Sequence, residues 1–347
     1  MHQQLLRMLI ELAVDKGLND INTDLKRAVR NLTDLGDYFA KGSFQKDFFK
    51  IARQMLSNED SPYYELVSEV VNNVDPYIIK NFGINIGLNS WTNGANQIRN
   101  IEKEKGFNVP WVIVFDLENK AENSLSKTEI LDIIQQGKEI GIYSYMFFIG
   151  NDDEYMDELL DIVKQNSECA FIIYSYPELL TKDNTSKLRE YGNAIVSVYM
   201  DPFNAQPEFE HAIKILLDNK CLFGSYFNYN DDNANMILDD SWVRYIEELH
   251  CMFAFLIKSK NCNNENSEKI SAHIKEAKTN QKYPVFLIDF YEDIMHIDRN
   301  ISTESCFIKI LQDGTIVFSE ETLTTEYNIR NNCILEILSL LAKSNIY

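Results

Sequence analysis

Short β-rich segments alternate with helical segments along the middle of this chain, and this alternation limits the fold more than any other feature. Six apolar runs of strand length, separated by helical patterns, are present in the sequence at 109–116, 143–150, 169–176, 193–201, 221–229 and 251–258. Apolar runs without polar alternation are typical of parallel strands that are buried on both faces. The pattern therefore predicts an α/β fold that contains a partial (β/α)6 barrel of the TIM type.

The segments on either side of this alternation have a different character. Apolar residues recur at helical spacing up to about residue 80, which predicts a helical N-terminal region. After Lys258 a polar, asparagine-rich stretch leads to a last strand and then to two apolar arms. We therefore expect a helical region at 1–105, the partial barrel at 106–260 and a C-terminal hairpin extension at 261–347.

Local signals place several boundaries within these regions. Ser61 precedes Pro62, as at the start of a helix, and Ser126 with Glu129 forms an S-x-x-E capping box. An Asp-Gly pair at 313–314, between the two apolar arms, predicts a type I′ turn. A barrel of only six strands leaves an open sheet edge, which the N-terminal helices or the C-terminal hairpin could cover.

The charge of the chain excludes some partners and favours others. Its formal net charge is -20 over 347 residues, and its lysines and arginines do not cluster. Nucleic acid and anionic membranes both require clustered positive charge, so neither is an expected partner. A basic peptide or a cationic surface on another protein fits better. The N-terminal stretch carries acidic residues within its apolar run, unlike a signal peptide, so we expect a cytoplasmic protein.

The cysteines form no motif. The chain contains six of them, widely spaced and without a C-x-x-C pair, at Cys169, Cys221, Cys251, Cys262, Cys306 and Cys333. This spacing indicates neither a disulfide framework nor a zinc site. We interpret them as reduced thiols that are mostly buried in the core.

Several of these segments, in order and with compatible spacing, resemble one enzyme family. The stretch from NVPWVIVFD to YSYMFFIG, followed by NAIVSVYMD, CLFGSYFNYNDDN and KYPVFLIDFYED with the ILQDGTI hairpin, resembles the radical S-adenosylmethionine enzymes with a C-terminal SPASM-type extension. The resemblance covers roughly residues 105 to 335. It implies a C-x3-C-x2-C loop after the first strand, which holds a four-iron four-sulfur cluster, and a G-G-E-P-like turn after the second strand, which binds the amino group of the cofactor.

The sequence departs from the family at both motifs. The loop after the first strand offers Asp116, Glu118, Asn119, Glu122 and Asn123, and no cysteine precedes Cys169. Carboxylates and amides cannot replace the soft thiolates that an iron–sulfur cluster requires. At the second strand Gly150 stands alone before Asn151, Asp152 and Asp153, and the auxiliary-cluster cysteines of the family would fall near Asn300 and Ser319. The resemblance therefore extends to the framework, and we expect neither a cluster nor bound S-adenosylmethionine.

Polar residues at the expected carboxyl ends of the strands form the candidate ligand site, because barrel active sites assemble there. They are Asp116, Glu118, Asn151, Asp152, Asp201 and Asn228. Such residues can perform acid–base chemistry or bind a divalent cation, although solvated loop carboxylates are the more common finding. No catalytic residue and no metal site is assigned from the sequence.

Three functions stay open, and one of them is an active radical enzyme with unprecedented cluster ligands. The first is a radical-SAM-like pseudoenzyme that acts as a binding, scaffolding or regulatory protein for a peptide or protein, such as a catalytically complete relative. The alternative is a cluster-free barrel enzyme that uses the acidic residues of the barrel mouth, with or without a divalent metal. The sequence leaves the oligomeric state open.

Overall fold

The computed structural model describes residues 2–21, 23–39, 43–119, 123–200, 206–302, 304–318 and 327–344. The chain divides into two compact units. Unit 1 consists of Met1–Ile84 and Ser197–Phe290, and unit 2 consists of Asn85–Val196 and Tyr291–Tyr347. The sequence predicts three consecutive domains, whereas each of these units combines two separate stretches of the chain. The expected domain boundaries stay a prediction.

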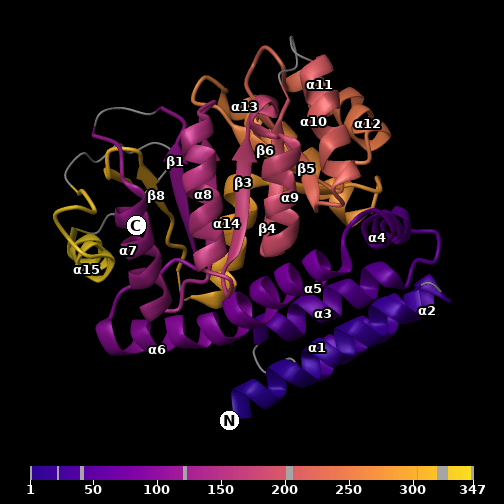
Figure 1. The fold of residues 1–347 in the computed structure, drawn as a ribbon, viewed down its shortest axis with the longest axis horizontal. Coiled ribbons are helices and arrows are strands. Elements are labelled where there is room, and N and C mark those ends of the chain that lie inside the picture. The colour runs from indigo at the N-terminus through magenta and orange to yellow at the C-terminus, as the bar shows by residue number, and fades with distance from the viewer. Residues whose placement is uncertain are drawn as a thin grey trace. The chain divides into compact units, whose positions relative to one another are not determined.

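Unit 1 combines the N-terminal helices with three parallel strands. Its elements are α1 (His2–Ile21), α2 (Leu25–Phe39), α3 (Ser43–Leu56), α4 (Pro62–Asn73), α5 (Pro76–Ile84), α10 (Gln206–Asp218), β5 (Phe223–Tyr229), α11 (Ala234–Leu238), α12 (Ser241–Glu248), β6 (Phe253–Lys258), α13 (Asn264–Thr279) and β7 (Phe286–Asp289). Helices α1, α2 and α3 lie side by side (Figure 1). Strand β6 pairs in parallel with both β5 and β7. The helical N-terminal region predicted from the sequence is confirmed.

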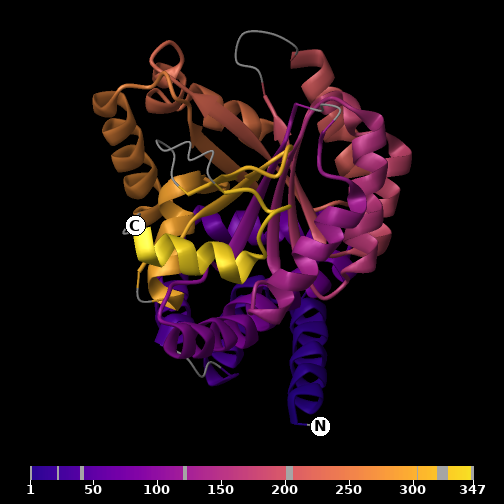
Figure 2. The ribbon, with the colours of Figure 1, turned by 90° about the vertical axis from the view of Figure 1, so that its left-hand side faces the viewer.

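Unit 2 carries the remaining strands. Its elements are the π-helix η1 (Asn85–Gly94), α6 (Ala95–Lys105), β1 (Val112–Leu117), α7 (Lys127–Glu139), β2 (Ser144–Ile149), α8 (Asp153–Gln165), β3 (Ala170–Ser175), the short 3-10 helix η2 (Pro177–Leu179), α9 (Lys182–Tyr191), α14 (Phe290–Ile301, whose first residue belongs to unit 1), β8 (Ile308–Leu311), β9 (Ile316–Val317) and α15 (Ile334–Ser344). Strand β4 (Ala194–Tyr199) spans the division between the units. Figure 2 views unit 2 from the side on which α15, in yellow, faces the reader.

The six strands predicted from the sequence are all present as β1 to β6, with a helix between each pair. In unit 2, β1 pairs in parallel with β2, and β2 pairs in parallel with β3. The predicted α/β fold class is therefore confirmed. Within the described ranges, no helix combines the length and the apolar character that crossing a bilayer requires.

The C-terminal hairpin forms, and it also extends the parallel sheet. Strand β9 pairs antiparallel with β8, while β8 pairs in parallel with β1 and so covers the edge of that strand. The prediction of a type I′ turn at 313–314 is wrong. Gly314 (φ 84°) is the only residue of the turn with a positive φ, and its amide donates to the Leu311 carbonyl at 2.9 Å. A type I turn that ends in a left-handed glycine bulge gives this pattern.

Both predicted helix starts are confirmed. The Ser61 hydroxyl accepts a hydrogen bond from the Tyr63 amide, and Pro62 is the first residue of α4. At α7, the Ser126 hydroxyl accepts from the Glu129 amide, and the Glu129 carboxylate accepts from the Ser126 amide at 2.8 Å. The pKa of Glu129 is lowered to about 2, mainly by a hydrogen bond from Arg330. This hydrogen bond joins the C-terminal segment to the start of α7.

An aromatic layer joins one face of the unit 2 sheet to its helices. The rings of Phe115 and Phe147, opposite each other on β1 and β2, are stacked 4.6 Å apart, and Phe171 on β3 continues the layer. Helix α7 faces the core with Ile130, Ile133 and Ile134, which recur at helical spacing and are buried. Burying each such side chain contributes roughly 2 kcal/mol, so this layer is a major source of stability.

Gly137 is required where α7 meets this layer. A Cβ at this position would lie 2.4 Å from the Tyr145 hydroxyl oxygen, which is buried and within 3.0 Å of the Ile134 carbonyl and 2.9 Å of the Ile142 carbonyl. A methyl group therefore cannot be added unless Tyr145 moves and its hydrogen bond is disturbed.

We predict that Gly137→Ala lowers the free energy of unfolding by about 1–3 kcal/mol, the usual effect of overpacking a core, although alanine is the better helix former. Urea unfolding followed by circular dichroism measures this change. Gln135→Ala, on the exposed face of the same helix, is the matched control and should change stability little. Equal stability of the two variants would contradict the packing described here.

Candidate functional site

The carboxyl end of β1 carries the first of the candidate residues. Side chains alternate along a strand, so Phe115 and Leu117 face the buried aromatic layer while Asp116 points to the opposite face of the sheet. In the strand register, Asp116 is paired with Phe148 on β2 and with Leu311 on β8. These partners share its face, and so does Lys309, two residues before Leu311.

Asp116 forms an ion pair with Lys309. The Lys309 Nζ lies 3.2 Å from the Asp116 Oδ2, and the two side chains are only 23% and 24% exposed. A half-buried carboxylate needs a partner, because desolvation without compensation is costly. The pair therefore holds the two side chains together at the end of β1.

Glu118 lies beside this pair, and within the part of the chain that the structure describes it forms no salt bridge with a lysine, arginine or histidine. Burial raises the pKa of Glu118 above its usual value, and the negative charge of Asp116 raises this pKa further. Lys309 and the Tyr176 hydroxyl, 3.5 Å from the Glu118 Oε1, act in the opposite direction. Glu118 can therefore hold or exchange a proton more readily than an ordinary surface carboxylate, or it can attract a cation.

Aromatic rings form the wall next to these charges. Phe148 and Tyr174, paired on β2 and β3, stack with their centroids 4.1 Å apart and their planes 9° from parallel. Tyr174 is buried, whereas Phe148 is partly accessible. The mouth of the unit 2 sheet thus combines two carboxylates, one ammonium group, the Tyr176 hydroxyl and an aromatic surface.

Residues after β2 play a structural part. A Cβ on Gly150 would lie 2.0 Å from the Glu118 carbonyl oxygen, so this glycine lets the ends of β1 and β2 approach closely. Asp152 is the N-cap of α8, and its Oδ1 accepts hydrogen bonds from the Glu154 and Tyr155 amides at 2.9 and 3.2 Å. Asn151 is exposed.

The remaining candidate residues lie in unit 1 or outside the described residues. Asn228 belongs to unit 1, on β5, and its carbonyl accepts a hydrogen bond from the Asn233 side chain at 3.1 Å. Asp201, Glu122 and Ser319 lie outside the described residues. Among the described candidates of unit 2, Asp116 and Glu118 interact through their charges.

The donor set at the end of β1 does not fit an iron–sulfur cluster. It consists of carboxylates and an ammonium group, whereas such clusters need thiolates. Five of the six cysteines are buried and Cys333 is exposed, so the interpretation of mostly buried thiols is confirmed. Burial raises the pKa of Cys169, Cys251 and Cys306, which disfavours the thiolate form. Among the described side chains, no group of three or more His, Cys, Asp or Glu is arranged to hold a metal ion.

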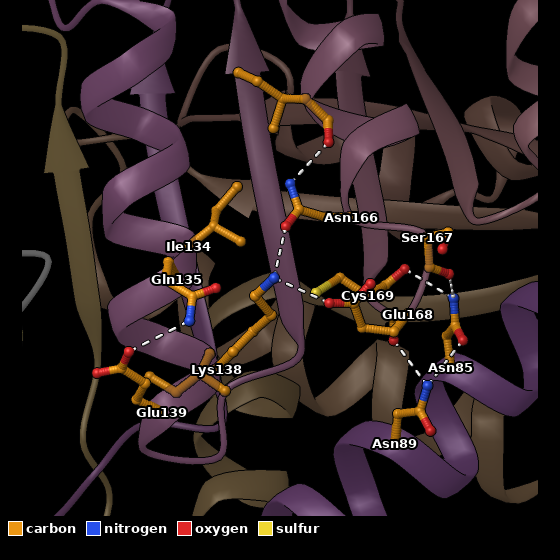
Figure 3. A network of polar contacts seen from close by, with 12 residues as sticks. Asn85, Asn89, Ile134, Gln135, Lys138, Glu139, Asn166, Ser167, Glu168 and Cys169 are labelled. Atoms are coloured by element: carbon orange, nitrogen blue, oxygen red, sulfur yellow. Dashed lines mark hydrogen bonds and ion pairs between the residues drawn. The ribbon is translucent and has the colours of Figure 1, made fainter.

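A polar network at the other end of β3 has no counterpart in the sequence analysis (Figure 3). The Lys138 Nζ donates to Asn166 at 3.0 Å and to Glu168 at 2.9 Å. The Asn85 side chain, from η1, donates to the Ser167 and Cys169 carbonyls at 2.8 and 2.9 Å. These bonds anchor η1 and α7 to the segment that enters β3, so the network supports the fold.

The glycine-containing stretch before β1 is part of this support. The structure has the π-helix η1 there, and the centroids of the Trp91 and Trp111 rings are 6.0 Å apart. A Cβ on Gly94 would lie 2.3 Å from the Gly141 carbonyl oxygen, which explains why a glycine ends η1.

Comparison with solved structures identifies the fold. The structure of Streptococcus suis SuiB bound to S-adenosylmethionine matches with a TM-score of 0.52 at 12% identity, over 71% of this chain and 69% of that chain. SuiB bound to the precursor peptide SuiA matches with a TM-score of 0.50 at 13% identity, over 69% of this chain and 67% of that chain. The chain has the radical S-adenosylmethionine fold. The resemblance predicted from the sequence is therefore confirmed for the fold.

Sequence comparisons give no further assignment. No protein-family model matches the chain, and no curated protein matches it. At 12–13% identity the radical-SAM likeness concerns the backbone framework alone. The chemistry of the site must be argued from its own residues.

We predict that Lys309→Met lowers the free energy of unfolding by about 1–3 kcal/mol, because it leaves the half-buried Asp116 unpaired beside Glu118. A second variant, Lys309→Met with Asp116→Leu, should recover part of this loss, because no unpaired charge remains at Asp116. Urea unfolding at neutral pH measures both variants.

Lys187→Met is the matched control. Lys187 forms ion pairs with Asp157 and Asp183 at an exposed position, where removing one partner has little effect. If Lys309→Met were no more destabilising than this control, the Asp116 and Lys309 pair would not support the site.

Proposed function

We propose that this protein uses the radical-SAM fold without an iron–sulfur cluster, as a binding, scaffolding or regulatory protein. The observation that carries the proposal is the end of β1, where an ion pair between Asp116 and Lys309 occupies the neighbourhood in which the family places its cluster loop. The chain contains no cysteine before Cys169. Carboxylates and a lysine cannot hold a four-iron cluster with one open iron.

A basic peptide or protein is the proposed partner. The net charge of -20 favours a cationic partner by long-range attraction. The SuiB structure in complex with a precursor peptide supports a peptide partner for a protein of this fold. A catalytically complete relative with a cationic surface is a second candidate partner. We place this function in the cytoplasm, and without bound S-adenosylmethionine.

The alternative is a cluster-free barrel enzyme, and one observation favours it. Glu118 has a raised pKa beside Asp116, as general acids often do beside a second carboxylate. In this reading Glu118 transfers the proton and Asp116 holds a cationic group or a divalent ion. The other candidate residues from the sequence, Asn151, Asp152, Asp201 and Asn228, stay predictions for either function.

We predict that the purified protein, after anaerobic reconstitution with iron and sulfide, shows no iron–sulfur charge-transfer absorbance and does not cleave S-adenosylmethionine. Reductive cleavage needs a cluster whose open iron binds the cofactor, and the loop after β1 supplies no thiolate. Absorbance spectra, iron analysis and an assay for 5′-deoxyadenosine measure the three consequences. A cluster-containing radical-SAM enzyme that is treated in parallel controls for the reconstitution.

The outcomes separate the two functions. Stoichiometric iron together with 5′-deoxyadenosine would overturn the pseudoenzyme proposal. A tightly bound divalent ion without iron–sulfur absorbance would favour the alternative enzyme, provided that Asp116→Asn and Glu118→Gln each abolish the metal binding. Retention of that ion by both variants would place it elsewhere and leave the mouth as a partner surface.

A further inference from the structure

A cavity lies in unit 2 at the other end of β1 from the mouth described above. Its volume is about 660 Å³, and residues from the last part of α6, the segment before β1 and the end of α14 line it. Ligand pockets for small molecules have volumes of this order. The cavity is independent of the proposed function, because neither Asp116 nor Glu118 belongs to its lining.

One side of the cavity is cationic. Arg99 and Lys103, one helical turn apart on α6, both line it. The Arg99 guanidinium donates to the Asn96 side chain at 3.2 Å and to the Asn300 carbonyl at 3.4 Å. In the part of the chain that the structure describes, neither Arg99 nor Lys103 forms an ion pair with a carboxylate. Two positive charges are thus left for a ligand that carries an anionic group.

The same cavity also contains two carboxyl groups. The Glu102 Oε1 accepts hydrogen bonds from the Val109 amide, at 3.0 Å, and from the Ser302 hydroxyl. Burial raises the pKa of Glu102, while the hydrogen bonds from Ser302 and Val109 and the charge of Arg99 act in the opposite direction. Glu304 is more exposed, and its contact with Asn108 is long, at 3.5 Å. These carboxyl groups suit a ligand that carries a positive charge.

The composition of the lining decides between ligand classes. A purely anionic ligand would place its charge near Glu102 and Glu304, and a purely cationic ligand would place its charge near Arg99 and Lys103. A ligand with both charges satisfies both sets at once, and Phe107 adds an apolar surface to the lining. We propose that this cavity binds a free α-amino acid with an apolar side chain. Its carboxylate pairs with Arg99 and Lys103, and its ammonium group pairs with the two glutamates.

The experiment is isothermal titration of the full-length protein with three related probes. L-Leucine carries both charges, L-leucinamide lacks the carboxylate, and N-acetyl-L-leucine lacks the ammonium group. We expect leucine to bind and each blocked probe to bind at least about tenfold more weakly, since each loses charge-assisted hydrogen bonds. No detectable binding of leucine, or equal binding of the three probes, would overturn the proposal.

Variants locate the site within the cavity. Arg99→Gln should weaken leucine binding about tenfold or more while leaving any leucinamide binding unchanged, because leucinamide has no carboxylate for Arg99 to hold. Lys187→Gln, at an exposed position outside the cavity lining, is the control and should bind leucine as the unaltered protein does. Unchanged leucine binding by Arg99→Gln would overturn the assignment of this cavity. The probe series on the unaltered protein decides the proposal even if a variant fails to fold.

Discussion

The parallel pairing of β8 with β1 is the interaction on which the mouth of unit 2 depends. It brings Lys309 to Asp116 although 193 residues separate them in the chain. It also covers the edge of β1, so that this strand is paired on both sides. A carboxylate at the end of β1 is thereby tolerated in a half-buried position, and its charge in turn affects the neighbouring Glu118.

Side-chain packing and hydrogen bonds hold the part of the unit 2 sheet that carries this mouth. The stacked rings of Phe115 and Phe147 hold one face of the sheet against its helices, and Gly150 lets the ends of β1 and β2 meet. At the opposite end, the bonds of Asn85 and Lys138 anchor the entry to β3. Each of these contacts uses side chains or backbone of the chain itself.

The parts of this structure that the sequence predicts are those set by local physics. Buried parallel strands require continuous apolar runs, and helix caps require particular residues within one turn, so the strands and the Ser126 cap could be found. Lys309 could not be found, because it lies within an apolar run and nothing local specifies that this run pairs with β1. The π-helix η1 likewise has no sequence signal that distinguishes it from a glycine-containing loop.

Two local signals are each compatible with more than one role. Asp152 follows a strand and so was a candidate ligand, but a carboxylate just before a helix is also a good N-cap, and the structure uses it in that way. The Asp-Gly pair at 313–314 suits two kinds of hairpin turn, and the length of the loop decides between them. In both cases the residue type was interpreted correctly as a local signal, while its role depended on neighbours.

We propose that Lys309, rather than a metal cluster, completes the carboxyl end of β1. The test is thermal unfolding of the protein as isolated, compared with the same protein after anaerobic incubation with a strong iron chelator. A ligand that binds only the folded state would raise the unfolding midpoint, so its removal would lower that midpoint. We expect equal midpoints before and after chelation. A midpoint that falls by several degrees on chelation, and recovers when iron and sulfide are restored, would contradict it.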